Sequence, residues 1–132
     1  MKFIIADDHP LFREALSGAL SPLFEGLEVL EAESTDALIK LLARSKDVDL
    51  LLLDLSMPGA NWFETLATVK ERYPALPIVM VSANDDIDVI SQTITLGAKG
   101  YITKATPTKI IAEAINTVLS GEQWLPADIA EK

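Results

Sequence analysis

The chain has 132 residues, a formal net charge of −9 and 49% hydrophobic residues, which fits one soluble domain with a real core. It has no cysteine and one histidine, His9, so disulfides, thiolate catalysis and zinc sites made of Cys or several His are excluded. Eleven Lys and Arg stand against twenty Asp and Glu. That balance gives no basic footprint, so we expect no direct nucleic-acid binding by this chain.

The sequence also bears on the cellular location. No apolar run approaches the roughly 18 residues that a membrane span needs. The first six residues lead straight into acidic ones, which is not typical of a signal peptide. We therefore expect no membrane association and a cytoplasmic location.

Short apolar runs alternate with longer helical patterns along the chain. The apolar runs, each predicted to be a strand, are residues 3–6, 27–32, 50–53, 78–81 and 100–103. A helical pattern follows each run, and the starts are marked by Pro10, Ser34, Asn61, Ile87 and Pro107. Four consecutive leucines at 50–53 suit a strand buried on both faces. Five such units predict an α/β fold with a parallel sheet covered by helices on both faces.

Details of the helices follow from the same patterns. Ser34 is expected to cap its helix, and Asn61 with Glu64 three residues later resembles a capping box. The residues expected to face the core from the first helix are Phe12, Ala15, Leu16 and Ala19. Those expected to face it from the fourth helix are Ile87, Ile90 and Ile94.

Chemically distinctive residues follow four of the predicted strands. The first strand leads to Asp7 and Asp8, the third to Asp54, the fourth to Ser82 and the fifth to Lys104. Each alone has an ordinary explanation as a helix start, a turn, a cap or a surface lysine. In a parallel sheet, however, the carboxyl ends of all strands lie at one edge, where ligands bind. We therefore expect these residues to converge.

This set of side chains supports phosphoryl chemistry. Three neighbouring carboxylates repel one another, and Mg2+, which prefers oxygen ligands, would relieve that repulsion. One carboxylate could then attack a phosphoryl group and become an acyl phosphate. Mg2+ and Lys104 would neutralise charge on the phosphoryl oxygens, and Ser82 could hydrogen-bond one of them. His9 is interpreted as a partly exposed loop residue rather than a phosphohistidine or metal ligand.

Residues 3–8, 51–59, 79–83 and 97–104 resemble the receiver domain of two-component response regulators, and the resemblance covers about residues 2–120. Residues 7–13, 100–104 and 121–126 are similar to the LuxR/NarL–FixJ-like subfamily, whose output domain is a helix-turn-helix. The resemblance implies a flavodoxin-like, doubly wound five-stranded parallel sheet in the order 2-1-3-4-5 with five helices. It implies a receiver (phosphoacceptor) domain at 1–120 and the start of a linker or C-terminal tail at 121–132. Because the six residues after Pro126 cannot form a helix-turn-helix, we expect either an excised receiver or one that stands alone.

The resemblance also implies roles for the acidic residues. Asp54 would accept a phosphoryl group from a sensor histidine kinase. Mg2+ would be held by Asp7, Asp8, Asp54 and the backbone carbonyl of Ser56. Lys104 would pair with Asp54 before phosphorylation and with the phosphoryl group afterwards.

The remaining implied roles concern switching. Ser82 and Tyr101 would form the switch, with the hydroxyl moving toward the phosphoryl group and the ring turning inward. Ser56 and Asn84 would tune the lifetime of the acyl phosphate. The domain would then catalyse only its own phosphorylation and slow dephosphorylation, so it would not be an enzyme acting on other substrates. It would control an output, which we expect to be transcription. Subfamily members often form homodimers through the first and fifth helices or through the fourth and fifth helices, and the sequence does not decide between these two interfaces.

Ala105 departs from the family pattern, in which proline often follows the lysine across a cis bond. A cis bond to alanine would cost roughly 3 kcal/mol, so the loop is expected to be trans or strained.

Three other functions share part of this residue pattern. A haloacid-dehalogenase-type phosphatase needs a second aspartate two residues after its nucleophile, where this chain has Ser56. A flavodoxin-like flavin module needs a Gly/Ser/Thr-rich phosphate loop after the first strand, and residues 7–10 have the wrong chemistry. The third alternative is a receiver-fold interaction module that acts unphosphorylated.

Overall fold

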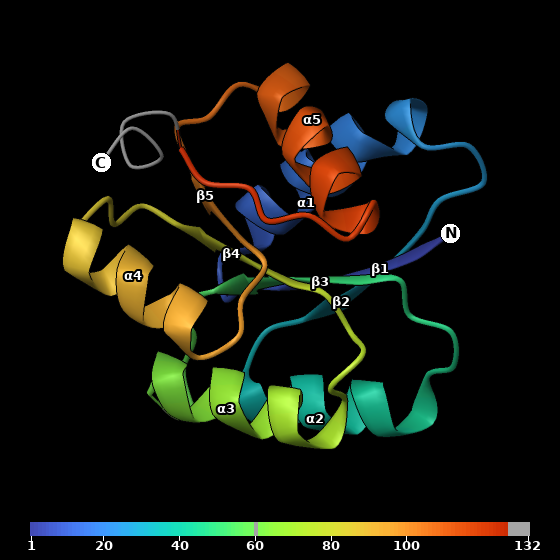
Figure 1. Cartoon of the computed structure of the whole chain (residues 1–132). Coiled ribbons are helices and arrows are strands. Elements are labelled where there is room, and N and C mark those ends of the chain that lie inside the picture. Colours follow the sequence, from blue (N-terminus) through green and yellow to red (C-terminus); the bar gives the residue numbers. More distant parts are fainter. Residues whose placement is uncertain (60, 127–132) are drawn as a thin grey trace.

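A five-stranded parallel sheet forms the centre of the computed structural model, which describes residues 1–59 and 61–126 (Figure 1). The strands are β1 (Lys2–Ala6), β2 (Glu28–Ala32), β3 (Leu50–Asp54), β4 (Ile78–Ser82) and β5 (Gly100–Thr103). Their order is β2-β1-β3-β4-β5, and every neighbouring pair is parallel. The fold and strand order expected from the sequence are therefore confirmed.

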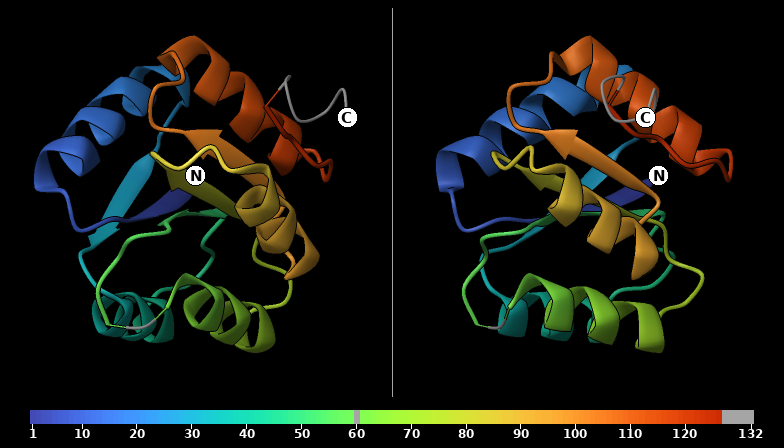
Figure 2. Two further views of the ribbon diagram at one scale, coloured as in Figure 1. Left: turned by 90° about the vertical axis from the view of Figure 1, so that its left-hand side faces the viewer. Right: turned by 60° about the vertical axis from the view of Figure 1, so that its left-hand side comes forward.

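Helices cover both faces of the sheet (Figures 1 and 2). The α-helices of the described residues are α1 (Pro10–Leu20), α2 (Thr35–Arg44), α3 (Trp62–Arg72), α4 (Ile87–Thr95) and α5 (Thr108–Leu119). A short 3-10 helix, η1 (Ser21–Leu23), extends α1. One apolar cluster joins the sheet to α1 and α5, and a second joins it to α2, α3 and α4.

The four leucines of β3 show how the sheet builds both cores. Leu50 and Leu52 belong to the cluster under α1 and α5, whereas Leu51 and Leu53 belong to the cluster on the opposite face. Successive side chains of a strand point to opposite faces, so a strand buried on both sides must be apolar throughout. Each of these leucines is at most 1% exposed, and burying one contributes about 1.5–3 kcal/mol.

The topology also fixes where a site can form. β1 lies between β2 and β3, so the chain leaves β1 in one direction and later returns on its other side. In such a sheet the crevice outside the carboxyl ends of the strands opens at this switch point. Asp7, Asp8 and Asp54 follow or end the two strands that border it.

Several local predictions were confirmed and some were wrong. Ser34 caps α2, because its Oγ accepts a hydrogen bond from the Ala37 amide at 3.1 Å. Asn61 occupies the N-cap of α3, but its side chain donates to Glu64 Oε1 at 3.1 Å and makes no bond to a helix amide. The capping-box prediction was therefore wrong in its bonding.

Two residues expected in the core are exposed. Ala15 lies on the outside of α1, whose inward stripe continues instead to the buried Leu20. Ile87 is 39% exposed because it begins α4, before the helix packs on the sheet. β2 begins at Glu28 rather than at residue 27.

Two further observations concern the described residues as a set. None of their peptide bonds is cis, so the bond from Lys104 to Ala105 is trans. Within residues 1–59 and 61–126, no helix combines the length and apolar character needed to cross a bilayer.

Candidate functional site

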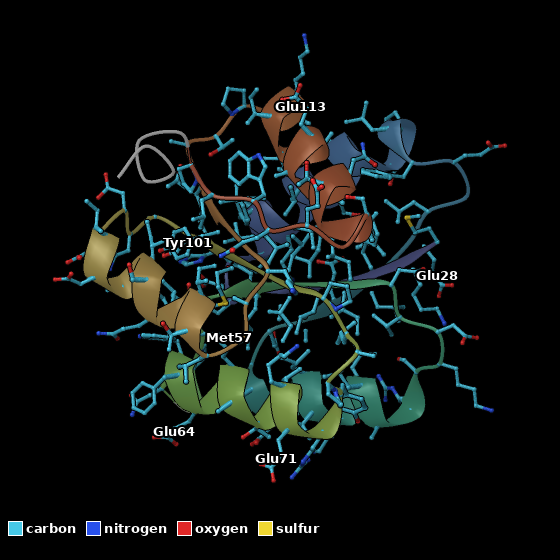
Figure 3. The ribbon with its side chains drawn as sticks, in the orientation of Figure 1. Glu28, Met57, Glu64, Glu71, Tyr101 and Glu113 are labelled. Carbon is cyan, nitrogen blue, oxygen red and sulfur yellow. The ribbon has the colours of Figure 1, made fainter. Side chains whose placement is uncertain are left out.

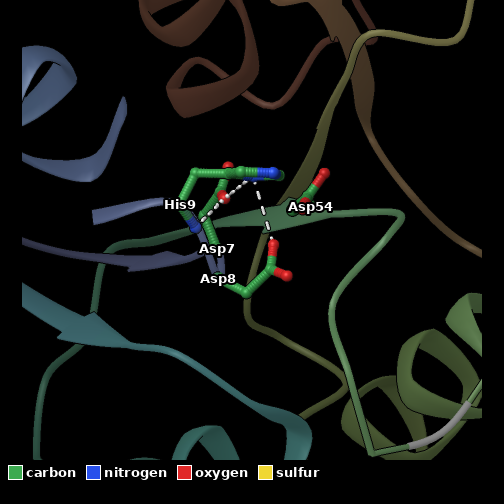
Figure 4. A group of neighbouring side chains, drawn as sticks. All are labelled: Asp7, Asp8, His9 and Asp54. Carbon is green, nitrogen blue, oxygen red and sulfur yellow. Dashed lines mark hydrogen bonds and ion pairs between the residues drawn. The ribbon is translucent and has the colours of Figure 1, made fainter. Parts of the chain in front are cut away.

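Three carboxylates meet at the carboxyl edge of the sheet (Figure 4). Asp7 and Asp8 follow β1, and Asp54 is the last residue of β3. Ligand-capable atoms of these residues and His9 all lie within 4.8 Å of one another. Asp7 is 1% exposed and Asp54 3%, so the structure brings together the acidic residues selected from the sequence and removes two of them from water.

Lys104 supplies the nearest positive charge. Its backbone amide donates to Ser82 O at 2.8 Å, which places the side chain beside the cluster. Its Nζ lies 2.9 Å from Asp7 Oδ2 and 3.6 Å from Asp54 Oδ1. Lys104 therefore reaches both carboxylates, but its closer partner is Asp7 rather than the expected Asp54.

The cluster still has an uncompensated buried oxygen. Asp54 Oδ2 is inaccessible to solvent and has no hydrogen-bond partner among the described residues. Burial raises the pKa of Asp54, and the charge of Asp7 raises it further. Lys104 and the Ser56 backbone N–H lower that pKa, and Asp8 raises it. A buried carboxylate oxygen without a partner is costly, so this position favours a cation.

His9 lies over the acidic cluster, which the sequence did not indicate. Its Nδ1 is 2.8 Å from Asp7 Oδ1, 3.1 Å from Asp8 Oδ1 and 3.3 Å from Lys104 Nζ. Its backbone N–H also donates to Asp7 Oδ1 at 2.8 Å. This is an Asx-turn, in which an aspartate side chain binds the backbone two residues later in the chain. The side chain is 59% exposed, as expected of a loop residue, but it contacts the site. The spacing from Asp7 was the one signal that could have suggested this turn.

Ser82 and Tyr101 are both buried next to the cluster. Ser82 ends β4 and is 2% exposed, and its Oγ accepts a hydrogen bond from the Asn84 amide at 3.0 Å. Tyr101, on β5, is fully buried on the side of the sheet that faces α4 (Figure 3). Its hydroxyl donates to Asn84 O at 2.5 Å, so both side chains bind the backbone of one loop residue.

The environment of Tyr101 keeps its hydroxyl a donor. Burial raises the pKa of Tyr101, and the nearby charges of Asp85, Asp54 and Asp86 raise it further. A hydrogen bond with the Ser82 side chain lowers it. The phenol therefore stays protonated at neutral pH and can maintain its bond to Asn84.

The two residues expected to tune lifetime lie on loops at the mouth of the site. Ser56 follows β3 and Asn84 follows β4, and both are exposed. Their positions flank Asp54 and Ser82, which is where a side chain could affect access to Asp54.

Comparison with curated proteins finds relatives among bacterial regulators. The chain is 44% identical over 128 residues to the glycerol metabolism activator of Pseudomonas putida, covering 97% of this chain and 58% of that protein. It is 32% identical to the oxygen regulatory protein NreC of Staphylococcus carnosus, covering 95% of this chain and 58% of that protein. The transcriptional activator protein ExaE of Pseudomonas putida is 28% identical, with 98% and 60% covered. The chain thus spans about three fifths of the length of these relatives.

Solved structures show the same architecture. The RcsB response regulator of Salmonella typhimurium superposes with a TM-score of 0.90 at 27% identity, covering 99% of this chain and 65% of that chain. The isolated REC domain of RcsB from Salmonella enterica serovar Typhimurium, in the presence of phosphomimetic BeF3−, gives 0.89 at 27% identity, covering 99% and 96%. A LuxR family DNA-binding response regulator from Silicibacter pomeroyi gives 0.86 at 27% identity, covering 97% and 98%.

The family assignment follows from a match over most of the chain. The family model of the response regulator receiver domain matches residues 3–116, which include Asp7, Asp8, Asp54, Ser82 and Lys104. The chain therefore belongs to the response regulator receiver domain family, and transcription regulators are among its relatives.

Proposed function

We propose that this receiver domain accepts a phosphoryl group on Asp54, with Mg2+, from a sensor histidine kinase and thereby switches conformation. The observation that supports this most strongly is Asp54 itself. Its Oδ2 is buried and unpartnered among the described residues, and its Oδ1 is 3.6 Å from the Lys104 ammonium. A carboxylate with one oxygen lacking any partner, beside a cation, suits attack on an electrophile.

The donor set fits a hard divalent cation. Ligand-capable atoms of Asp7, Asp8 and Asp54 lie within 4.8 Å of one another, and the Ser56 carbonyl is the further ligand we assign. When bound, Mg2+ supplies positive charge that offsets the carboxylates and the phosphoryl oxygens. Lys104 alone cannot balance the negative charge of three carboxylates. The positive charge of a bound cation would let the site accept the phosphoryl group as well.

The transfer step moves a phosphoryl group from a donor phosphohistidine of the kinase to Asp54. An ionised Asp54 oxygen attacks phosphorus, an O–P bond forms and the N–P bond of the donor phosphohistidine breaks. The electron pair of that bond stays on the leaving imidazole, which takes up a proton. Lys104 neutralises charge on the transferred group, as a nearby ammonium does in other phosphoryl transfers.

The Ser82 hydroxyl can hydrogen-bond a phosphoryl group that is carried by Asp54. Its Oγ accepts from the Asn84 amide at 3.0 Å, and a hydroxyl that accepts can also donate its own proton, which would be directed to a phosphoryl oxygen on Asp54. An acyl phosphate on Asp54 carries a charge of about −1.5 to −2 where the ionised carboxylate carried one negative charge, and it brings acceptor oxygens near that proton. That new hydrogen bond would order the loop at 82–84, whose Asn84 carbonyl also accepts a hydrogen bond from the Tyr101 hydroxyl.

The output is proposed from the relatives. Regulators such as ExaE carry a transcriptional name, and the solved RcsB structures include dimers bound to DNA. Since the chain spans about three fifths of its curated relatives, we assign DNA binding to sequence outside it. The domain would act in the cytoplasm, with homodimerisation as part of the response and no turnover of other substrates.

The test is the intact mass of the protein after incubation with Mg2+ and acetyl phosphate. We expect the added mass of one phosphoryl group in the parent and in Asp36→Asn, an exposed carboxylate on α2. We expect none in Asp54→Asn. A parent protein that gained no mass would refute the proposal and leave the interaction module that acts unphosphorylated.

A further inference from the structure

The chain returns to the sheet after α5 and pairs with β5 (Figure 1). The Trp124 amide donates to Lys99 O at 3.0 Å, and the Tyr101 amide donates to Trp124 O at 3.3 Å. Gly100 and Trp124 form a parallel bridge. Residues 122–126, which we call the edge strap, thus contact the open edge of the sheet as a sixth strand would.

The side chains of the edge strap also behave like those of a strand. Trp124 packs on the apolar cluster under α1 and α5, whereas Leu125 packs on the opposite cluster, which contains Tyr101. Such alternation is typical of an extended segment at a sheet edge. Gly100 permits the approach, because a Cβ there would lie 3.3 Å from Trp124 O and 3.3 Å from Val118 Cγ2.

The edge strap is held weakly compared with the sheet. Two backbone hydrogen bonds attach it to Lys99 and Tyr101, a third joins the Glu122 amide to Thr117 O at 3.2 Å, and residues 124–126 of the strap are only partly buried. Segments with few buried contacts and few backbone bonds open at lower free energy than the core. Opening of the edge strap should therefore cost less free energy than opening of the sheet.

A continuous set of hydrogen bonds joins the edge strap to the site. Trp124 O accepts from the Tyr101 amide, and the Tyr101 hydroxyl donates to Asn84 O. The Asn84 amide donates to Ser82 Oγ, which lies at the carboxyl edge beside Asp54. Tyr101 is the central member, since its backbone contacts the edge strap and its hydroxyl contacts the loop of the site.

We propose that the edge strap is a detachable sixth strand whose docking on β5 is coupled to the phosphorylation site through Tyr101. This rests on the proposed phosphorylation of Asp54. A phosphoryl group there offers acceptors to the Ser82 hydroxyl, which orders residues 82–84 and with them the acceptor of the Tyr101 hydroxyl. A more firmly held Tyr101 favours the docked edge strap, and the polypeptide that follows Pro126 receives the signal. By linkage, docking favours the phosphorylated arrangement to the same extent.

Amide hydrogen exchange measured by NMR tests the coupling without changing the sequence. After Mg2+ and acetyl phosphate, we expect the Trp124 and Tyr101 amides to exchange about fivefold or more slowly, the lower end of usual coupling. The Glu28 amide, which donates to Met1 O at 2.8 Å on the opposite edge strand, is the internal control and should not change. Asp54→Asn should abolish the effect.

A second arm needs no phosphorylation. Tyr101→Phe removes only the hydroxyl that binds Asn84 and keeps the ring and the backbone amide. We expect the Trp124 amide to exchange faster in this variant relative to Glu28, and its response to acetyl phosphate to be lost although phosphoryl mass is added. Tyr73→Phe, at the chain's other tyrosine, is the matched control and should leave Trp124 exchange unchanged.

The outcomes separate the two proposals. Phosphoryl mass on Asp54 with unchanged Trp124 exchange would overturn the coupling and leave the phosphoacceptor function intact. Absence of phosphoryl mass would overturn that function, and the Tyr101→Phe arm would still decide whether Tyr101 controls the edge strap. A Trp124 amide as unprotected as that of an unfolded chain would overturn the docked strand itself.

Discussion

Replacing Lys104 with methionine removes the ammonium that faces two buried carboxylates while keeping a side chain of similar length. At 2.9 Å from Asp7 and 3.6 Å from Asp54, the attractions are about 6 and about 5 kcal/mol at an effective dielectric constant near 20. Most of this is offset by the desolvation of an ammonium that is 18% exposed. Removing one partner of a buried pair costs about 3–5 kcal/mol, and we expect about 3 kcal/mol because Lys104 keeps some solvent contact.

The assay is urea denaturation at neutral pH in EDTA, with the parent protein and Lys99→Met for comparison. Lys99 is exposed, so its replacement should stay within about 0.5 kcal/mol of the parent. Mg2+ should restore part of the stability lost in Lys104→Met, because it supplies the missing positive charge. A loss below about 1 kcal/mol in EDTA, or equal losses for the two lysines, would refute the idea that Lys104 compensates a buried carboxylate.

Three further predictions use the same stability measurements. Mg2+ at ten times its dissociation constant should stabilise the parent by about 1.4 kcal/mol and Asp8→Asn by much less, and equal shifts in thermal melting would contradict a site at Asp8. Burial raises the folded-state pKa of Asp54, so ionisation of this residue destabilises the fold as pH rises through that pKa. Asp54→Asn should therefore be more stable than the parent at neutral pH without Mg2+. This advantage should disappear below about pH 3.8, the pKa of Asp54 in the unfolded chain. A constant difference across that range would show that ionisation of Asp54 does not matter. Leu52→Ala, at a position 1% exposed, should cost about 2–5 kcal/mol, against less than about 0.5 for Leu11→Ala at 82% exposure, as chemical denaturation would show.

The strands and the convergence of the acidic residues were predictable because topology decides both. Four leucines in a row leave little alternative to a strand buried on both faces, and alternating helices make the sheet parallel. Once the sheet is parallel, Asp7 and Asp54 must meet at one edge, whatever their separation in sequence. Periodicity was therefore sufficient to locate the site.

Side-chain contacts within the site were not predictable, because they depend on angles that periodicity does not encode. His9 turns back over the cluster through its bond to Asp7, although its high exposure resembles that of any loop residue. Lys104 Nζ lies closer to Asp7 Oδ2, at 2.9 Å, than to Asp54 Oδ1, at 3.6 Å. Resemblance to a family supplies a partner but no such geometry.

The misplaced helix residue and the pairing of Trp124 with the sheet, which the sequence did not predict, have a similar origin. Ala15 looked apolar enough for the core, but the inward stripe of α1 is completed by Leu20 instead. Trp124 and Leu125 form too short a segment to be recognised as a strand. Their pairing with β5 depends on the close approach that Gly100 allows, which is a property of the folded sheet.

The most direct test of the central claim is the intact mass of the chain after Mg2+ and acetyl phosphate, measured again after hydroxylamine, which cleaves acyl phosphates. We predict one phosphoryl mass that depends on Mg2+, disappears with hydroxylamine and is absent from Asp54→Asn. A phosphoryl mass that survives hydroxylamine, or that persists in Asp54→Asn, would contradict Asp54 as the acceptor.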